Sequence, residues 1–175
     1  SIAWGVTNNI CAQRDLYKET PDENNPNMFL YDGKWEKSQT KQISIKVKNS
    51  NDHVINLITT RNGPIVDHLL PGPLKNLGPV SLKWVGFQFS DELTCLLDLN
   101  KSKTCKEGIK SLENWEVPTW SFVIGDNKGD ICYQSTGNIP IRNNWNRRFR
   151  DGSDPESSWQ TSIPKKYMPS IYNPS

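Results

Sequence analysis

The stretch WSFVIG at Trp120–Gly125, followed by DICYQS at Asp130–Ser135, decides the fold class of this chain. Both segments are short and rich in β-branched and aromatic residues, which favour a strand. The polar turn between them, Asp126–Gly129, ends in a glycine and is typical of a hairpin. Because a hairpin pairs its two strands antiparallel, this region predicts an antiparallel sheet.

Two more hairpins are predicted upstream. Met28–Tyr31 and Lys34–Lys37 flank Asp32-Gly33, a dipeptide that supplies the positive φ angles of a tight turn. Gln42–Val47 alternates apolar and polar residues, and Val54–Thr60 follows it after a polar loop, which predicts a hairpin with a longer connection.

Short strands are also expected at Ile2–Thr7, Leu16–Glu19 and Ser81–Phe87. A helix is expected to begin with Ser90 as its cap, and Cys105–Leu112 predicts a second short helix.

The order of these elements is strands, two helices and strands again, and the chain after Gly137 is expected to be mostly irregular. This order predicts an α+β fold with a β majority.

The composition favours a loop-rich body. Of the 175 residues, only 34% are hydrophobic, below the ~45–50% usual in globular domains. Twelve prolines and eleven glycines shorten the elements, whereas seven tryptophans can each bury a large apolar area. We therefore expect residues 1–175 to form a single partial domain that completes its core against other segments.

The charges nearly balance, with 21 basic and 19 acidic residues and a net charge of +2. This balance gives no general attraction to nucleic acid or to an anionic membrane. No apolar run approaches the ~18–20 residues of a membrane span, and we expect neither partner.

The cysteines are Cys11, Cys95, Cys105 and Cys132, and no CxxC pair occurs among them, so a zinc site is not expected. Cys95 and Cys105 bracket a short polar loop that a disulfide could close in an oxidising compartment. Four unpaired thiols are the alternative, and the sequence leaves both open.

Three segments, in the same order, resemble stretches of the penicillin amidase and acyl-homoserine-lactone acylase family of N-terminal-nucleophile serine hydrolases. They are Ile2–Asn8 with Asp15–Tyr17, then Arg61–Val66, and finally Asn114–Arg142. Together they span nearly the whole chain. The resemblance implies an internal segment of the catalytic β chain, part of an αββα sandwich with mostly antiparallel strands.

The family resemblance also implies a mechanism. A serine exposed by self-cleavage attacks a linear amide, its own α-amino group acts as the base, and an acyl-serine intermediate forms. A main-chain N–H after the Trp-Gly motif and an asparagine side chain hold the oxyanion. Carried over, Asn8 is the main-chain donor, and Val6, Trp84 and Trp120 match positions that line the acyl pocket.

The nucleophile is not expected to be Ser1. In the family, the serine precedes the Trp-Gly motif by several tens of residues, whereas Trp4-Gly5 follows Ser1 almost at once. The final residues resemble the stretch just before the oxyanion asparagine. We therefore expect the chain to be inactive alone and to need the remaining segments of the same acylase, the α chain and the rest of the β chain.

Family members often bind calcium, and Asp15 fits one ligand position. Ala12 stands where a second carboxylate is usual, and calcium prefers six to eight oxygen ligands. We expect no cofactor to be required and any calcium site to be weakened. Family members are usually exported, so the resemblance implies a periplasmic or extracellular parent that acts on a small-molecule amide.

Two other functions are alternatives to this one. A non-catalytic secreted module could bind sugars through exposed tryptophans, which would require two or three of them on one face. The segment Arg142–Arg150 interleaves cations and aromatic residues as single-strand binders do, although such runs are more often solvated loops.

Overall fold

The computed structural model describes residues 1–144 and 148–174. They separate into two compact units. The first unit contains residues 1–13, 85–141 and 160–175, and the second contains residues 14–84 and 142–159. The expectation that residues 1–175 form a single partial domain stays a prediction.

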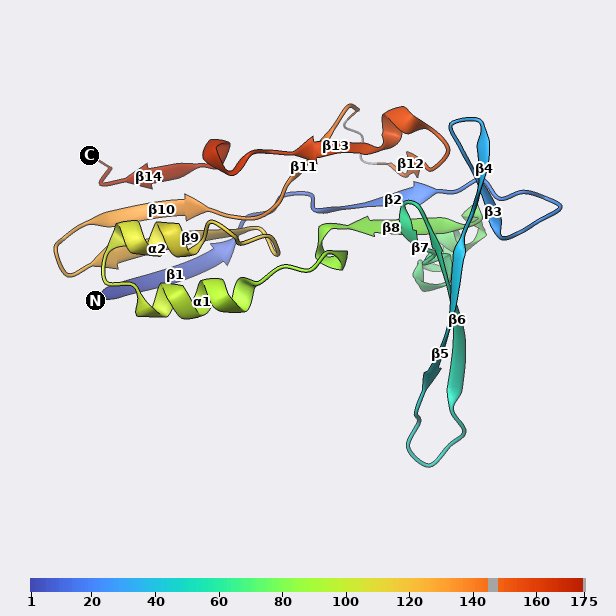
Figure 1. Ribbon diagram of the computed structural model, residues 1–175, viewed down its shortest axis with the longest axis horizontal. Helices are drawn as coiled ribbons and strands as arrows, with labels where there is room; N and C mark the ends of the chain where they lie inside the picture. Colours follow the sequence, from blue (N-terminus) through green and yellow to red (C-terminus); the bar gives the residue numbers. More distant parts are fainter. Residues whose placement is uncertain (145–147, 175) are drawn as a thin grey trace. The chain divides into compact units, whose positions relative to one another are not determined.

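The first unit is one antiparallel sheet covered by two helices (Figure 1). Its strand order is β1-β9-β10-β14. The bounds are β1 Ile2–Asn8, α1 Glu92–Lys101, α2 Cys105–Ser111, β9 Trp120–Asp126, β10 Ile131–Ser135 and β14 Ser170–Tyr172, with 3-10 turns at Val85–Phe87 and Lys165–Tyr167.

The second unit is built from short strands in three small sheets, ordered β12-β2-β8, β3-β4 and β5-β6-β7. The bounds are β2 Arg14–Lys18, β3 Met28–Tyr31, β4 Lys34–Lys37, β5 Gln39–Ile45, β6 His53–Thr60, β7 Gly63–Pro64, β8 Val80–Trp84 and β12 Arg150–Asp151. Its 3-10 turns are Asp67–Leu69, Gly72–Leu77 and Pro155–Ser157. The strands β11 Pro140–Arg142 and β13 Trp159–Ser162 lie where the chain passes from one unit to the other.

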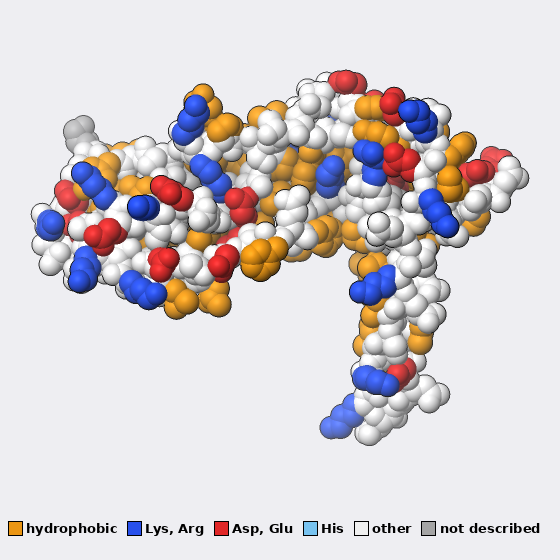
Figure 2. Space-filling view, viewed as in Figure 1, with side chains coloured by type: hydrophobic (Ala, Val, Ile, Leu, Met, Phe, Trp, Pro, Cys, Tyr) orange, Lys and Arg blue, Asp and Glu red, His pale blue; other side chains and the backbone are white. Residues whose placement is uncertain are grey.

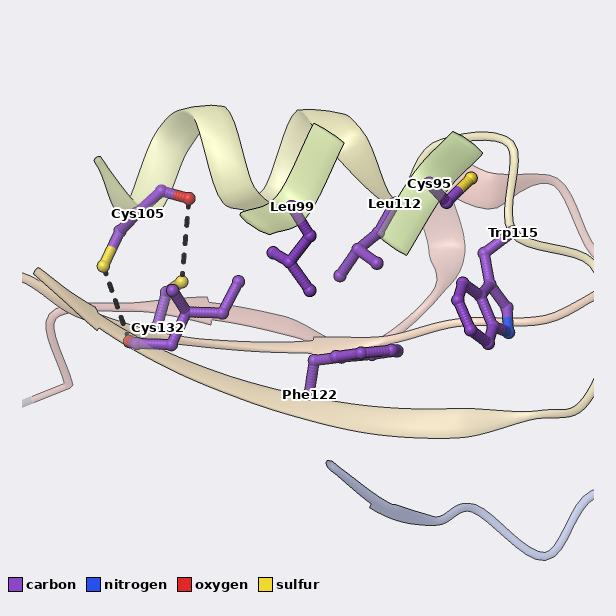
Figure 3. Packing of buried hydrophobic residues seen from close by; sticks show 8 residues of the cluster. Cys95, Leu99, Cys105, Leu112, Trp115, Phe122 and Cys132 are labelled. Atoms are coloured by element: carbon purple, nitrogen blue, oxygen red, sulfur yellow. Dashed lines mark hydrogen bonds between the residues drawn. The ribbon is translucent and has the colours of Figure 1, made fainter. Parts of the chain in front are cut away.

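The core of the first unit lies between the helices and one face of the sheet (Figure 3). Leu99 of α1 and Phe122 and Ile124 of β9 are fully buried there. The approach of α2 to β9 is close because Gly108 has no side chain: a Cβ on it would lie 2.9 Å from Ile124 Cδ1. Residue alternation along each strand decides which side chains enter this core.

The other face of the same sheet carries exposed apolar side chains. Val123, Ile131 and Ile171 alternate with the core residues and are 58%, 50% and 51% exposed. One helical layer on one sheet face corresponds to half of an αββα sandwich, so the predicted β-rich α+β fold is confirmed.

The predicted hairpins are confirmed, and two local expectations were wrong. The strand expected at Ser81–Phe87 ends at Trp84, and Val85–Phe87 forms a 3-10 turn. The helix cap is Asp91, whose side chain accepts a hydrogen bond from Thr94 N, whereas the Ser90 hydroxyl donates to Glu92. A carboxylate one residue nearer the helix thus takes the capping role. Among the described residues after Gly137, the short strands β11–β14 pair with other parts of the chain, and most of the remaining residues are irregular, as expected.

Candidate active site

Asn8 is the last residue of β1, directly opposite Trp120 of β9. The next residue, Asn9, donates its N–H to Thr119 O at 3.1 Å, so position 9 faces β9 with its hydrogen-bonding groups. In an antiparallel ladder the next position turns its N–H and C=O away from the partner strand. The Asn8 N–H is therefore directed away from β9.

β1 is the edge strand of the four-stranded sheet, so no other strand of the described residues pairs with its outer side. The Asn8 N–H lies along that outer side and is available to an external acceptor. The Asn8 side chain is exposed and takes no part in this arrangement.

The backbone beside Asn8 is fixed by buried polar residues. Thr119 Oγ1 donates to Asn9 O, and Asn9 Nδ2 donates to Ser135 Oγ at 2.5 Å. Thr119 and Ser135 are 6% and 1% exposed. Gly137 lies against Thr119, where a Cβ would come within 2.5 Å of Thr119 Cγ2. These contacts hold the end of β1 against β9 and β10.

Gln13 supplies a second anchor for the chain that leaves β1. Its Nε2 donates to Glu116 O at 2.7 Å and Asn138 O at 2.8 Å, and its Oε1 accepts from Thr119 N at 3.1 Å. A buried amide that satisfies three main-chain groups acts as a rigid clamp. Gln13, Asn9 and Ser135 were not predicted from the sequence, and a lone glutamine in the connection before β2 carries no pattern that would identify it.

Val6 and Trp120 lie next to the Asn8 donor. Val6 is 41% exposed, and by strand alternation its side chain lies on the same sheet face as Trp4 and Trp120. Trp120 is partly buried and packs against Trp115, with 5.1 Å between ring centroids. The structure thus brings Val6, Asn8 and Trp120 together, with apolar surface beside the N–H.

Ser1 lies at the opposite end of β1 from Asn8. Its ammonium group donates to Asn127 Oδ1 at 3.4 Å, and its carbonyl accepts from Asn127 N. Ser1 and Asn8 are seven positions apart along an extended segment, a span of about 23 Å at ~3.3 Å per residue. The Ser1 hydroxyl therefore cannot reach a carbonyl carbon whose oxygen the Asn8 N–H binds.

Trp84, the remaining predicted pocket residue, belongs to the second unit. It ends β8 opposite Arg14, 38% exposed, and alternation places it on the same face as Leu82. On that face is an open apolar hollow of about 1070 Å³. Its lining is mostly leucine, from Leu16, Leu69, Leu70, Leu74, Leu77 and Leu82.

Asp15 is engaged within the second unit by two donors. Arg142 Nε lies 2.7 Å and Trp159 Nε1 2.6 Å from its Oδ2, and the Arg142 side chain is only 5% exposed. Lys83 is the cross-strand neighbour of Asp15. Burial lowers the pKa of the Lys83 ammonium group, and the positive charge of Arg61 lowers it by a smaller amount. Asp15 is thus the anion of a buried ion pair.

This environment does not fit a calcium ion. Calcium takes several anionic oxygens, whereas Asp15 offers one carboxylate whose Oδ2 already accepts two hydrogen bonds. Within residues 1–144 and 148–174, no group of three His, Cys, Asp or Glu side chains could hold a metal ion.

Asn62, in the Arg61–Val66 motif, has a structural role. It is 3% exposed, and its Nδ2 donates to Glu19 Oε1 at 3.2 Å. Glu19 is also buried and accepts from Thr60 Oγ1 and Ser81 Oγ. Asn62 therefore helps to solvate an internal carboxylate.

The cationic segment Arg142–Arg150 includes residues 145–147, which lie outside the described residues. Arg142 binds Asp15, and the 4%-exposed Arg150 donates to Ser157 O and Asn144 O. These two cations are internal and are not presented to a nucleic acid. Figure 2 shows basic and acidic side chains interspersed over α1 and α2.

The most exposed tryptophans in the described ranges are Trp35 and Trp84, and they lie on different sheets. They therefore do not form the row on one sheet face that a sugar-binding module would need. No helix among the described residues is long and apolar enough to cross a membrane.

These features define a β-rich α+β protein whose antiparallel sheet presents a main-chain N–H at its edge. The chain belongs to the penicillin amidase family, because the model of that family, described as penicillin amidase, matches residues 1–175.

Among curated proteins, the chain is similar to the acyl-homoserine lactone acylase QuiP of Pseudomonas aeruginosa, with 26% identity over 167 residues. That match covers 90% of this chain and 19% of the relative. It is also similar to penicillin G acylase of Escherichia coli, with 24% identity over 181 residues, covering 99% of this chain and 20% of the relative. The chain thus spans about a fifth of the length of these curated relatives.

Among solved structures, the thermostable penicillin G acylase of Alcaligenes faecalis matches with a TM-score of 0.78. The sequence identity is 20%, and the match covers 99% of this chain and 31% of that chain. At this identity the match establishes the fold.

Proposed function

We propose that this chain is the part of an acylase that supplies the main-chain oxyanion donor for hydrolysis of a linear amide. The observation that carries the proposal is the Asn8 N–H, which follows the family's Trp-Gly motif and is directed outward from the sheet edge. The acylase and amidase names of the relatives agree with this chemistry.

In the proposed reaction, a serine at the terminus of another segment attacks the amide carbonyl carbon. Its free α-amino group takes the hydroxyl proton and passes it to the leaving amine nitrogen, which suits an amine with a pKa near ~7.7–8.0. The C–N bond breaks to leave an acyl-serine, and water then releases the carboxylic acid.

The Asn8 N–H stabilises the oxyanion that forms in each of these two steps. A backbone donor that is already fixed needs no reorganisation during the reaction, and one such donor is typically worth ~3–4 kcal/mol. Thr119, Ser135 and Gln13 provide that rigidity through the contacts described above. Val6 and Trp120 offer apolar surface for the acyl group. The role of Trp84 in binding the acyl group stays a proposal that rests on the family resemblance.

The partners of the chain are then the other segments of the same acylase and a small-molecule amide, and export of the parent is part of the proposal. The nucleophile is proposed to come from another segment because Ser1 is at the far end of β1 from Asn8.

The isolated 175-residue chain is expected to show no hydrolysis of chromogenic acyl amides, even at high protein concentration, because serine, base and Asn8 donor do not meet within it. The measurement is release of the chromophore, with the Ser1→Ala variant as the control. Turnover by the chain that disappears in Ser1→Ala would overturn the assignment of the nucleophile.

Calcium is expected to leave the stability of the chain unchanged. Because Asp15 is already paired with Arg142 and Trp159, millimolar calcium or a chelator should move the melting temperature by less than about 1 °C. Thermal unfolding followed by circular dichroism checks this, with magnesium as the control cation. A calcium-dependent rise in melting temperature that is lost in Asp15→Asn would contradict it.

A further inference from the structure

Two of the four cysteines are buried side by side in the core of the first unit. Cys105 is the first residue of α2 and is fully buried, and Cys132 of β10 is 3% exposed. In Figure 3 these two side chains lie together at one end of the cluster, whereas Cys95 lies near Trp115 at the other end. Both are free thiols.

Cys105 and Cys132 both lie next to Ile124 of β9. Cys105 Sγ donates to Ile124 O at 3.4 Å, and Ile124 is the direct cross-strand partner of Cys132. Cys132 Sγ in turn donates to Cys105 O at 3.9 Å. Burial, together with a smaller effect of the neighbouring Cys105 thiol, raises the pKa of Cys132 to about 12.

We propose that Cys105 and Cys132 form a disulfide that joins α2 to β10 when the chain folds in the presence of a small disulfide such as oxidised glutathione. The proposal depends on the position of the two thiols and not on the acylase function. It replaces Cys95–Cys105 as the pairing to be expected, since those two residues lie at opposite ends of the cluster.

The chemistry is thiol–disulfide exchange. One cysteine thiolate attacks a sulfur of the small disulfide and releases one small thiol, leaving a mixed disulfide on the protein. The second cysteine attacks the protein sulfur of that bond and releases the second small thiol. The two cysteines lose two protons and two electrons, and the small disulfide is reduced to two thiols.

The order of events follows from burial. Both thiols are enclosed in the folded unit, and burial raises the pKa of each of them, so little thiolate is exposed to an oxidant there. The bridge therefore forms during folding, before α2 closes over the sheet. Once formed, it ties together residues 27 positions apart and restricts the unfolded chain.

The test is to refold the full chain in a glutathione redox buffer, block free thiols, digest without reduction and identify linked peptides by mass spectrometry. The peptides that contain Cys105 and Cys132 should be linked, and two of the four thiols should be lost. The melting temperature should exceed that of the reduced chain by about 5–10 °C.

Two variants serve as matched controls. Cys132→Ala should lose the linkage and the difference in melting temperature, whereas Cys95→Ala should keep both. If Cys132→Ala does not fold, as judged by circular dichroism, the peptide map of the unmodified sequence still decides. A Cys95–Cys105 linkage, or four free thiols in a chain refolded to the folded spectrum, would overturn the proposal.

Discussion

Replacing Gly63 with alanine is expected to destabilise the second unit by about 4 kcal/mol or more, enough to unfold a marginal domain. Gly63 has a φ of +136°, a conformation that side chains rarely allow. An added Cβ would lie 2.0 Å from Leu82 O and 2.9 Å from Leu82 C. Both atoms are backbone of β8, so no rotamer change can relieve the overlap.

Gly33→Ala is the matched control for that substitution. Gly33 lies in the same unit and also has a positive φ, +69°, but no atom lies within 4 Å of the position of its Cβ. Its replacement should cost only about 1–2 kcal/mol, the penalty for the backbone conformation alone. Urea unfolding followed by circular dichroism measures both variants, and equal losses of stability would contradict the role given to the Leu82 contact.

Local chemistry explains why the hairpins could be predicted from the sequence. Met28–Tyr31 and Lys34–Lys37 were placed correctly because Asp32-Gly33 permits only a few tight turns, and Asp32 and Gly33 both have positive φ. Alternation of apolar residues likewise identified the β5–β6 pair. These signals act within a few residues and need no knowledge of the rest of the chain.

Such local signals could not predict pairing between segments that are far apart in the sequence. β14 joins β10 although the Cys132–Tyr172 partners are separated by some forty residues, and nothing in Ser170–Tyr172 indicates its partner. The same is true of Asn62, whose burial against Glu19 depends on chain segments far apart in sequence. The pairing of β14 and the burial of Asn62 therefore depend on tertiary contacts.

The candidate site follows from the family resemblance, and the structure shows how its residues are arranged. The sequence marks Val6, Asn8 and Trp120 only through the family motifs, and strand register then brings them together. The structure also changes the interpretation of Asp15, because Arg142, a distant residue, supplies the opposite charge. Gln13 was missed because its three main-chain partners, two carbonyl acceptors and one N–H donor, come from loops whose positions the sequence does not reveal.

Asn8→Pro removes the Asn8 N–H, the group proposed to hold the oxyanion. A proline is compatible with this position because the lost N–H is directed outward from an edge strand and takes no part in the β1–β9 ladder. Asn8→Ala is the matched control, since it shortens the exposed side chain and keeps the backbone donor. A variant that only disturbed the fold would change KM and the melting temperature as well.

The decisive measurement is the steady-state rate of amide hydrolysis by the acylase assembled from this chain and its remaining segments. Asn8→Pro is expected to lower kcat by roughly 10²–10³-fold with little change in KM, and Asn8→Ala to leave kcat within about threefold. An Asn8→Pro enzyme that keeps its rate, or an equal loss in both variants, would contradict the assignment of the Asn8 N–H as the oxyanion donor.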